Sequence, residues 1–164
     1  MNINIAHIER EVYSKCGLEI ADFKIELESQ EYDACQFNLS GCQIISRSAK
    51  ITPKKKGQFV TFWKRYENGP IEPFNESDNI DFFVVNVKDD GRLGQFVFPK
   101  SLLVKKGVLT TSKKEGKRAI RVYPGWDEVA SKQANQTQKW QLNYFYQITP
   151  EIDFRAVLDL YGLK

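Results

Sequence analysis

Residues 80–99 read IDFFVVNVKDDGRLGQFVFP, and this stretch decides the fold. Its first part, residues 80–87, is strongly apolar and rich in β-branched and aromatic side chains, which is typical of a β-strand. Asp89, Asp90 and Gly91 then form a turn signal, because Asp and Gly tolerate the left-handed backbone of tight hairpin turns. Residues 94–99 resume the apolar pattern. The stretch therefore predicts a hairpin of two antiparallel strands.

The segments on either side of this hairpin predict helices at both ends of the chain and further strands between them. Residues 2–15 carry apolar side chains at helical spacing with charged residues between them, and Gly17 follows where a helix end favours glycine. Ser40 and Gly41 separate two strand-like runs, at 32–39 and 43–47, which indicates a second hairpin. The remaining predicted elements are strands at 58–66 and 119–123, a short helix at 101–104, and helices at 134–148 and 152–161.

This order of elements predicts an α+β fold. We expect a single domain over residues 1–164, with a central mixed, mostly antiparallel sheet flanked by helices. No apolar run approaches the roughly 20 residues that a membrane-spanning helix needs. The first residues do not form a secretory signal. We therefore expect a cytoplasmic protein with no membrane segment.

The net charge of +3 hides an uneven distribution of charged side chains. Residues 1–33 carry eight acidic and three basic side chains, whereas residues 46–66 carry seven basic side chains and no acidic one. Residues 100–121 carry eight basic side chains and one acidic one. If the two basic segments fold onto one face, that face suits a polyanion. The alternative is that each segment is an ordinary solvated surface.

The first basic segment, SRSAKITPKKKGQFVTFWKRY at residues 46–66, also contains four aromatic side chains. Cations attract phosphates and flat rings stack on bases, so the mixture is typical of a nucleic-acid-binding surface. Trp63 suits a core position equally well. The candidate nucleic-acid-binding residues of this segment are Arg47, Lys50, Thr52, Lys54, Gln58, Lys64 and Arg65.

Two further segments contribute candidates for the same surface. In the second basic segment, Lys117, Arg121 and Tyr123 share one face of a predicted strand, where cations can pair with an anion and a ring can stack. The helix predicted at 134–148 is rich in glutamine, and its Gln138 and Gln141 offer amides that suit the edges of bases. The alternatives are a solvated strand face, and a helix whose aromatic residues are core while its glutamines face solvent.

A metal-dependent nuclease requires carboxylates that hold Mg²⁺ and usually a lysine that steers the attacking water. In nucleases of the PD-(D/E)XK class, an aspartate opens one strand and an acid-x-lysine triplet lies on the next. Here the triplet would be Gln95, Phe96 and Val97. An amide is a weak ligand for a divalent cation and valine cannot orient water, so we expect no catalytic residue and no metal. If the protein is a nuclease, its candidates are Asp78, Asp81, Gln95 and Lys100, with Mg²⁺ as cofactor.

Other catalytic classes lack their residues in this sequence. His7 is the only histidine, and Cys16, Cys35 and Cys42 form no CxxC pair. Neither histidine-based catalysis nor a zinc or disulfide framework is therefore indicated. The sequence contains no GxGxxG or GxxxxGK[ST] motif. We expect no cofactor.

Six motifs together resemble the MepB family of small bacterial proteins. They are RxAKxTPxKxGQFVxxWKR at 47–65, PF at 73–74, DxxD at 78–81, GQFxFPK at 94–100, GKRxxRVYP at 116–124 and TQxWQ at 137–141. The resemblance implies a single α/β domain similar to type II restriction endonucleases, without a complete nuclease active site. It also implies binding of nucleic acid or nucleobases. The family has no established catalytic residues, so it assigns none to this chain.

Three functions remain as hypotheses. The first is a non-catalytic protein that binds nucleic acid or nucleobases, with nucleic acid or nucleotides as partners. The second is a divalent-metal-dependent nuclease that uses Asp81. The third is a protein-interaction module whose acidic N-terminal helix and basic face bind protein partners. The sequence does not determine the oligomeric state.

Overall fold

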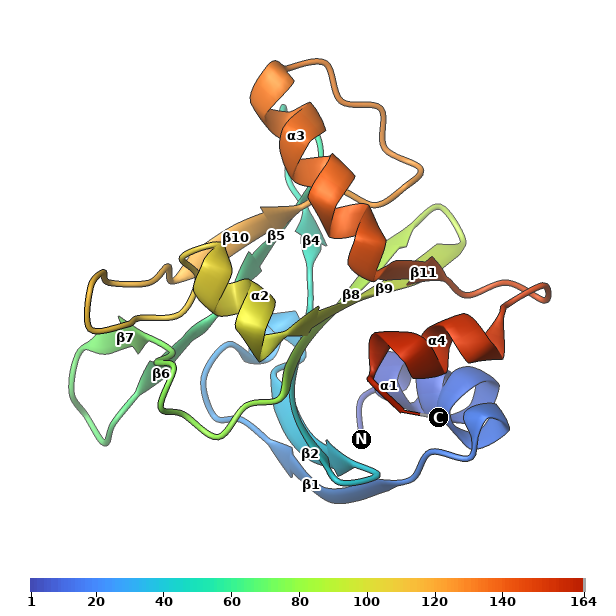
Figure 1. Cartoon of the computed structure of the whole chain (residues 1–164), viewed down its shortest axis with the longest axis horizontal. Helices are drawn as coiled ribbons and strands as arrows, with labels where there is room; N and C mark the ends of the chain where they lie inside the picture. Colours follow the sequence, from blue (N-terminus) through green and yellow to red (C-terminus); the bar gives the residue numbers. More distant parts are fainter. Residues whose placement is uncertain (164) are drawn as a thin grey trace.

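The computed structural model describes residues 1–163 and is built on one six-stranded sheet that is covered on both faces (Figure 1). β3 (Cys42–Ser48) and β8 (Phe82–Asp89) are parallel, and all other neighbouring strands of this sheet are antiparallel. The fold is α+β with a mixed, mostly antiparallel sheet, as predicted. The strands, in order across the sheet, are β1 (Ile20–Ile25), β2 (Cys35–Leu39), β3 (Cys42–Ser48), β8 (Phe82–Asp89), β9 (Arg92–Pro99) and β11 (Phe145–Gln147).

The predicted hairpin is formed by β8 and β9, which pair along their whole length inside the sheet. Asp90 and Gly91 have positive φ angles of 48° and 79°, as the predicted turn requires. Phe82 and Val84 pack into the apolar cluster on one face, whereas Phe83 packs into the cluster on the other. A strand covered on both faces is apolar at nearly every position, which explains the sequence of this stretch.

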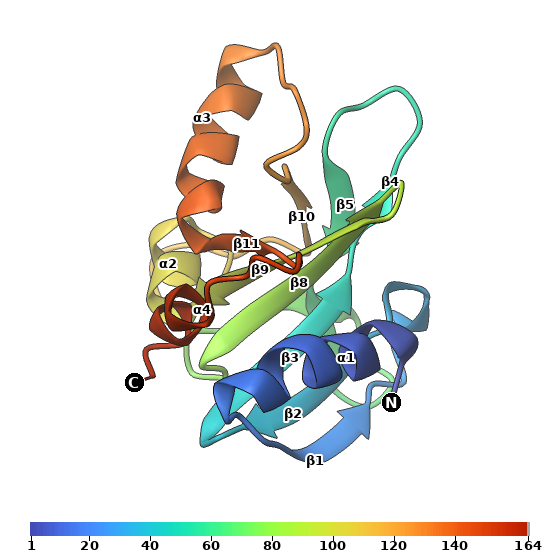
Figure 2. The same cartoon turned by 90° about the vertical axis from the view of Figure 1, so that its right-hand side faces the viewer.

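Helices from the two ends of the chain cover one face of the sheet. α1 (Ile3–Ile8) continues through a π-helical turn at Glu9–Tyr13 and a 3-10 turn at Ser14–Cys16. α4 (Phe154–Leu160) contacts the end of this helix, and both pack on the same apolar cluster (Figure 2). The sequence predicted both helices. No helix within residues 1–163 is long and apolar enough to cross a membrane.

The other face carries two small sheets and a short helix. β10 (Ala119–Val122), β5 (Gln58–Thr61) and β4 (Lys50–Ile51) form a three-stranded sheet, and β6 (Trp63–Arg65) pairs with β7 (Ile71–Pro73). α2 (Lys100–Lys105) follows β9 directly. Val60 of β5, Val122 of β10 and Phe62 between β5 and β6 belong to the second apolar cluster. Because β5 pairs with β10, the two basic segments of the sequence meet in one sheet.

Some elements differ from the sequence prediction. The helix predicted at 134–148 is wrong beyond Tyr144, because α3 (Lys132–Gln141) continues only through a 3-10 turn at Leu142–Tyr144 before β11 pairs with β9. Of the aromatic residues of β11, Phe145 is half-buried against Phe96 of the neighbouring strand and Tyr146 is buried. The strand predicted at 58–66 is divided between β5 and β6, which lie in different sheets. β1 was not predicted, since most of its side chains are exposed.

Candidate functional site

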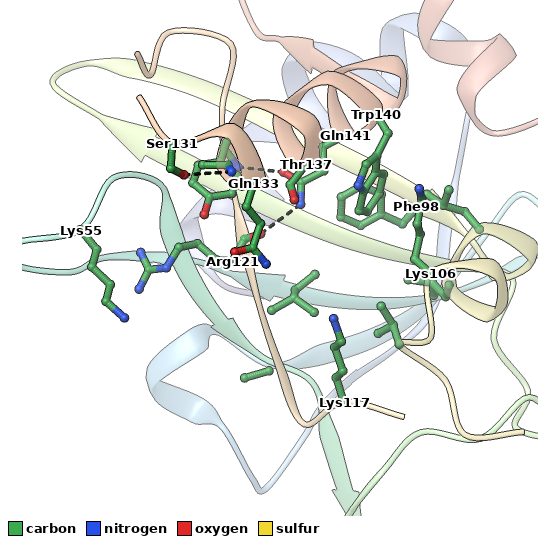
Figure 3. Close-up of a pocket in the computed structure, with 17 residues that line it drawn as sticks. Lys55, Phe98, Lys106, Lys117, Arg121, Ser131, Gln133, Thr137, Trp140 and Gln141 are labelled. Atoms are coloured by element: carbon green, nitrogen blue, oxygen red, sulfur yellow. Dashed lines mark hydrogen bonds between the residues drawn. The ribbon is translucent and has the colours of Figure 1, made fainter. Parts of the chain in front are cut away.

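A pocket of about 480 Å³ lies between β10, α2 and α3 (Figure 3). Pockets of roughly 300–1,000 Å³ are typical of small-molecule sites. The lining combines three kinds of side chain. The cations are Lys55, Lys106, Lys117 and Arg121; the apolar side chains include Phe98, Leu102, Leu103, Val108 and Ile120; and α3 contributes Ser131, Gln133, Ala134, Thr137, Trp140 and Gln141.

Two glutamines hold α3 in place as one wall of the pocket. The Gln141 side chain donates from Nε2 to the carbonyl of Arg121 (3.0 Å) and accepts the N–H of Tyr123 at Oε1 (2.9 Å). It therefore bonds β10 as a neighbouring strand would. Gln138 donates to the carbonyls of Pro124 (3.0 Å) and Asp127 (2.9 Å). Both predicted glutamines thus bind protein backbone and are not free to read a base.

The electrostatic character of the pocket is positive. Within residues 1–163, its lining contains four cations and no carboxylate. Arg121 donates from Nη1 to the carbonyl of Lys56 (3.1 Å), which ties β10 to the basic loop at residues 52–57. The ammonium group of Lys106 lies 4.8 Å from the centre of the Trp140 ring, a cation–π distance. The pocket is suited to an anion that also has an apolar or flat part.

Tyr123 and Gly57 fix the loop end of the pocket. Gly57 has a φ of 78°, and a Cβ atom there would lie 2.7 Å from the Tyr123 ring. Any side chain at this position would therefore displace the ring or the loop. The glycine that begins the GQFV sequence at 57–60 is thus required by the close approach of the basic loop to β10.

The structure brings together four of the residues selected from the sequence: Lys117, Arg121, Tyr123 and Gln141. Sequence reasoning missed Lys55 and Lys106, which complete the cationic lining. Lys55 lies in the predicted basic loop, and it is a defined position of the motif at 47–65 although it was not selected as a binding residue.

Other selected residues of the first basic segment lie outside this pocket. Lys50 is exposed on β4, with its ammonium group 4.9 Å from the centre of the Tyr32 ring. Lys54 is exposed in the basic loop. The Thr52 hydroxyl is buried and has no hydrogen-bond partner among the described residues. These residues remain candidates for contacts beside the pocket, and Gln138 lies behind it on α3.

Four predicted binding residues do not have free side chains on the surface. Arg47 is buried in an ion pair with Glu26, and its burial lowers the pKa of the guanidinium despite that carboxylate. Gln58 is also buried, and its Nε2 donates to the carbonyl of Lys88 (3.3 Å). Arg65 pairs with Glu28 (3.2 Å). The layers of the fold cover Arg47 and Gln58, so in this structure neither predicted side chain is exposed to a ligand.

Lys64 of β6 is the fourth of these residues. Its side chain reaches Asp78, one of the predicted nuclease residues, near the open end of the β8–β9 hairpin. Its ammonium group pairs with Asp78 (2.8 Å), and the second oxygen of Asp78 accepts the N–H of Asn75 (2.8 Å). Asp81 accepts the N–H of Gln43 (2.7 Å). Lys100 donates from Nζ to the carbonyl of Asp78 (2.7 Å). These side chains are engaged in holding the local backbone.

Gln95 lies far from that cluster. It pairs with Asn86 near the middle of the hairpin. The carbonyl of Asp81 instead accepts the N–H of Lys100 at the open end of the hairpin. Five residues of extended chain separate Asp81 from Asn86, which is about 17 Å. No group of three or more metal-binding side chains occurs within the described part of the chain. The predicted nuclease residues therefore do not form one site.

The side chain of Gln95 is the centre of a buried hydrogen-bond network. Its Oε1 accepts the hydroxyls of Tyr146 (2.6 Å) and Tyr161 (2.8 Å), and its Nε2 donates to Asn86 (2.9 Å). Tyr13 lies 3.4 Å from the same oxygen but only 2.7 Å from the Tyr161 hydroxyl. Two lone pairs suffice for two donors, so Tyr13 bonds chiefly to Tyr161. Burial raises the pKa of all three tyrosines.

Comparisons with known proteins agree with the six sequence motifs. A family model described as MepB-like matches residues 26–147. A crystal structure of MepB is 36% identical to the chain, covers 92% of it and 100% of its own length, and has a TM-score of 0.79. A bacterial homing endonuclease is 17% identical over 85% of this chain and 86% of its own, with a TM-score of 0.46, which is too low for any argument. No curated protein matches. The chain belongs to the MepB-like family.

Proposed function

We propose that this protein binds nucleic acid or nucleotides without cutting them, and that the pocket between β10, α2 and α3 is the binding site. The observation that carries the proposal is the lining of that pocket, in which four cations and no carboxylate surround an apolar floor. Cations bind the phosphates of a nucleotide, and apolar or aromatic surfaces bind its base. The pairing of β5 with β10 brings cations from both basic segments to this place.

The geometry of the nuclease candidates supports binding without cleavage. Asp81 lies at the open end of the hairpin and Gln95 near its middle, five residues further along the strands, so they cannot hold one metal ion. Gln95 is fully buried, and its carbonyl oxygen is already occupied by tyrosine hydroxyls.

The test is the salt dependence of binding to labelled single-stranded DNA and RNA, measured by fluorescence anisotropy with and without Mg²⁺. We expect the logarithm of the association constant to fall linearly with the logarithm of salt concentration. Lys55→Ala and Lys117→Ala should each make that slope shallower by about 0.7, the contribution of one phosphate on a single strand. The nucleic acid should stay intact with Mg²⁺.

Lys64→Ala is the matched control, because Lys64 is paired with Asp78 outside the pocket. It should leave the slope unchanged. Absence of binding at low salt would contradict the proposal, and so would equal effects of the three substitutions. Cleavage that Asp81→Asn abolishes would instead support the nuclease hypothesis.

A further inference from the structure

We infer that the pocket takes an unpaired nucleotide with a phosphate on each side of its sugar and base, as an internal nucleotide of a single strand has. This inference rests on the proposed function and names its ligand class. A free nucleobase has no phosphate, and a duplex has no unpaired base, so both are poorer ligands.

The cations of the pocket form two pairs at opposite ends. Lys55 and Arg121 form the pair at the loop end, where Arg121 donates to the carbonyl of Lys56. Lys106 and Lys117 form the pair at the α2 end, where the N–H of Lys117 donates to the carbonyl of Val108 (2.9 Å). Figure 3 shows Lys55 and the Arg121 guanidinium on one side of the hollow, and Lys106 beside Trp140 on the other.

The distance between the pairs favours two phosphates over one. Lys117 precedes β10 and Arg121 lies within it four residues later, so their Cα atoms are at most about 13 Å apart. The Arg121 guanidinium is tied to the loop carbonyl, and the Lys106 ammonium lies over the Trp140 ring. The two ends therefore bind separate anionic groups, and the long lysine and arginine side chains can bring their charges close enough for the two phosphates that flank one nucleotide.

The space between the two pairs is suited to a base. Its floor is apolar, with Leu103 and Ile120 among the lining residues. Gln133 and Thr137 of α3 also line it, and within residues 1–163 neither side chain makes a hydrogen bond to protein. Free amide and hydroxyl groups beside an apolar floor can bond the edge of a base that lies on it.

The position of α3 argues against a duplex in the pocket. The helix forms one wall, and its two glutamine anchors hold it next to β10. The bases of a duplex are paired in its interior, so only its phosphates would reach the cations, and the apolar floor would stay empty. One alternative surface for a duplex is the exposed outer face of α3 with Gln136 and Lys139, which lie away from the pocket.

The experiment compares four small ligands by calorimetry at one salt concentration: thymidine, its 5′-monophosphate, its 3′-monophosphate and its 3′,5′-bisphosphate. We expect the bisphosphate to bind about tenfold or more tighter than either monophosphate, since each phosphate gains a charge-assisted contact. Anisotropy should show tighter binding of an oligothymidylate strand than of a duplex of the same length.

Three variants locate the two phosphates. Lys55→Ala and Lys106→Ala should each reduce the affinity for the bisphosphate to about that for a monophosphate. Lys139→Ala, on the outer face of α3, should leave it unchanged. A bisphosphate that binds no tighter than the monophosphates would overturn the inference, as would a duplex whose tighter binding depends on Lys139. If no nucleotide or strand binds even at low salt, the proposed function itself fails.

Discussion

Arg47 and Glu26 form a buried ion pair between the strand β3 and the residue that follows β1. The Arg47 side chain is 1% exposed and that of Glu26 is 14% exposed. Glu26 also accepts a hydrogen bond from Gln36 (2.7 Å), and Arg47 donates to the carbonyl of Ser46 (3.0 Å). A buried charge with this many partners is destabilising when its counterion is removed.

We expect Glu26→Gln to lower the free energy of unfolding by about 3–5 kcal/mol, because the guanidinium would stay buried without a counterion. Urea unfolding at neutral pH measures this loss. Glu28→Gln is the control, since Glu28 pairs with Arg65 on the surface and such pairs contribute about 1 kcal/mol or less. Equal losses in the two variants would show that the buried pair contributes no more to the free energy of unfolding than the surface pair does.

Sequence reasoning could not distinguish Arg47 from the exposed cations around it. The partner of Arg47 lies beyond β2, next to a strand that the sequence did not predict. By contrast, Lys117, Arg121 and Tyr123 were predicted for a common face, because alternation along one strand places them together without any distant partner. The local sequence pattern does not show that segments distant in the chain bury the Arg47 side chain.

At the scale of elements, α3 depends on hydrogen bonds to backbone more than on apolar packing. Gln141 is the only residue of this helix that is buried. Its side chain occupies the edge of β10 that does not pair with β5, and it is the hydrogen-bond partner of the Tyr123 N–H. One amide group therefore sets the width of the pocket at this position.

We expect Gln141→Ala to increase the rate of amide hydrogen exchange at Tyr123 by about tenfold or more, since a hydrogen bond of about 1–3 kcal/mol is lost. Exchange measured by NMR tests this. Gln141→Glu is the matched control, because a carboxylate still accepts from Tyr123 but cannot donate to the Arg121 carbonyl. Unchanged exchange in Gln141→Ala would mean that packing alone protects this edge.

The elements that the sequence predicted well are those with a local signature. The hairpin of β8 and β9 has a continuous apolar pattern with a turn signal, and the structure confirms it. The end of α3 was wrong because β11 becomes a strand through its pairing with β9, in which Phe145 lies opposite Phe96. The pocket could not be predicted as a whole, since it requires α2, α3 and β10 to be placed side by side.

At the scale of the whole molecule, Gln95 joins three distant parts of the chain. Tyr13 belongs to the N-terminal helix, Tyr146 to β11, and Tyr161 follows α4. The network lies inside the apolar cluster between the helices and the sheet. Burial raises the pKa of each tyrosine above its ordinary value near 10, because the charged form would lose its hydration.

The raised pKa values predict a loss of stability at high pH. Above about pH 10 the tyrosines ionise in the unfolded chain but stay protonated in the folded protein, so unfolding releases up to three protons. The free energy of unfolding should then fall by about 4 kcal/mol per pH unit. Cys35, whose pKa burial raises to about 11, should begin this decline near pH 9. Urea unfolding between pH 8 and pH 12 measures the slope.

Tyr161→Phe is the control for this decline, since it removes one of the three buried hydroxyls. Its slope should be shallower by about one third, although the variant is less stable at neutral pH. A slope equal to that of the unchanged protein would contradict the assignment of the decline to this network.

The hydrogen bond between Tyr13 and Tyr161 joins residues 148 positions apart. During synthesis on the ribosome, the first helix therefore emerges long before the residue that secures it against the sheet. Contacts between such distant segments form late and slowly, because a long loop has to close first. The nascent chain therefore exposes the apolar side of its first helix and of an unfinished sheet until Tyr161 has emerged.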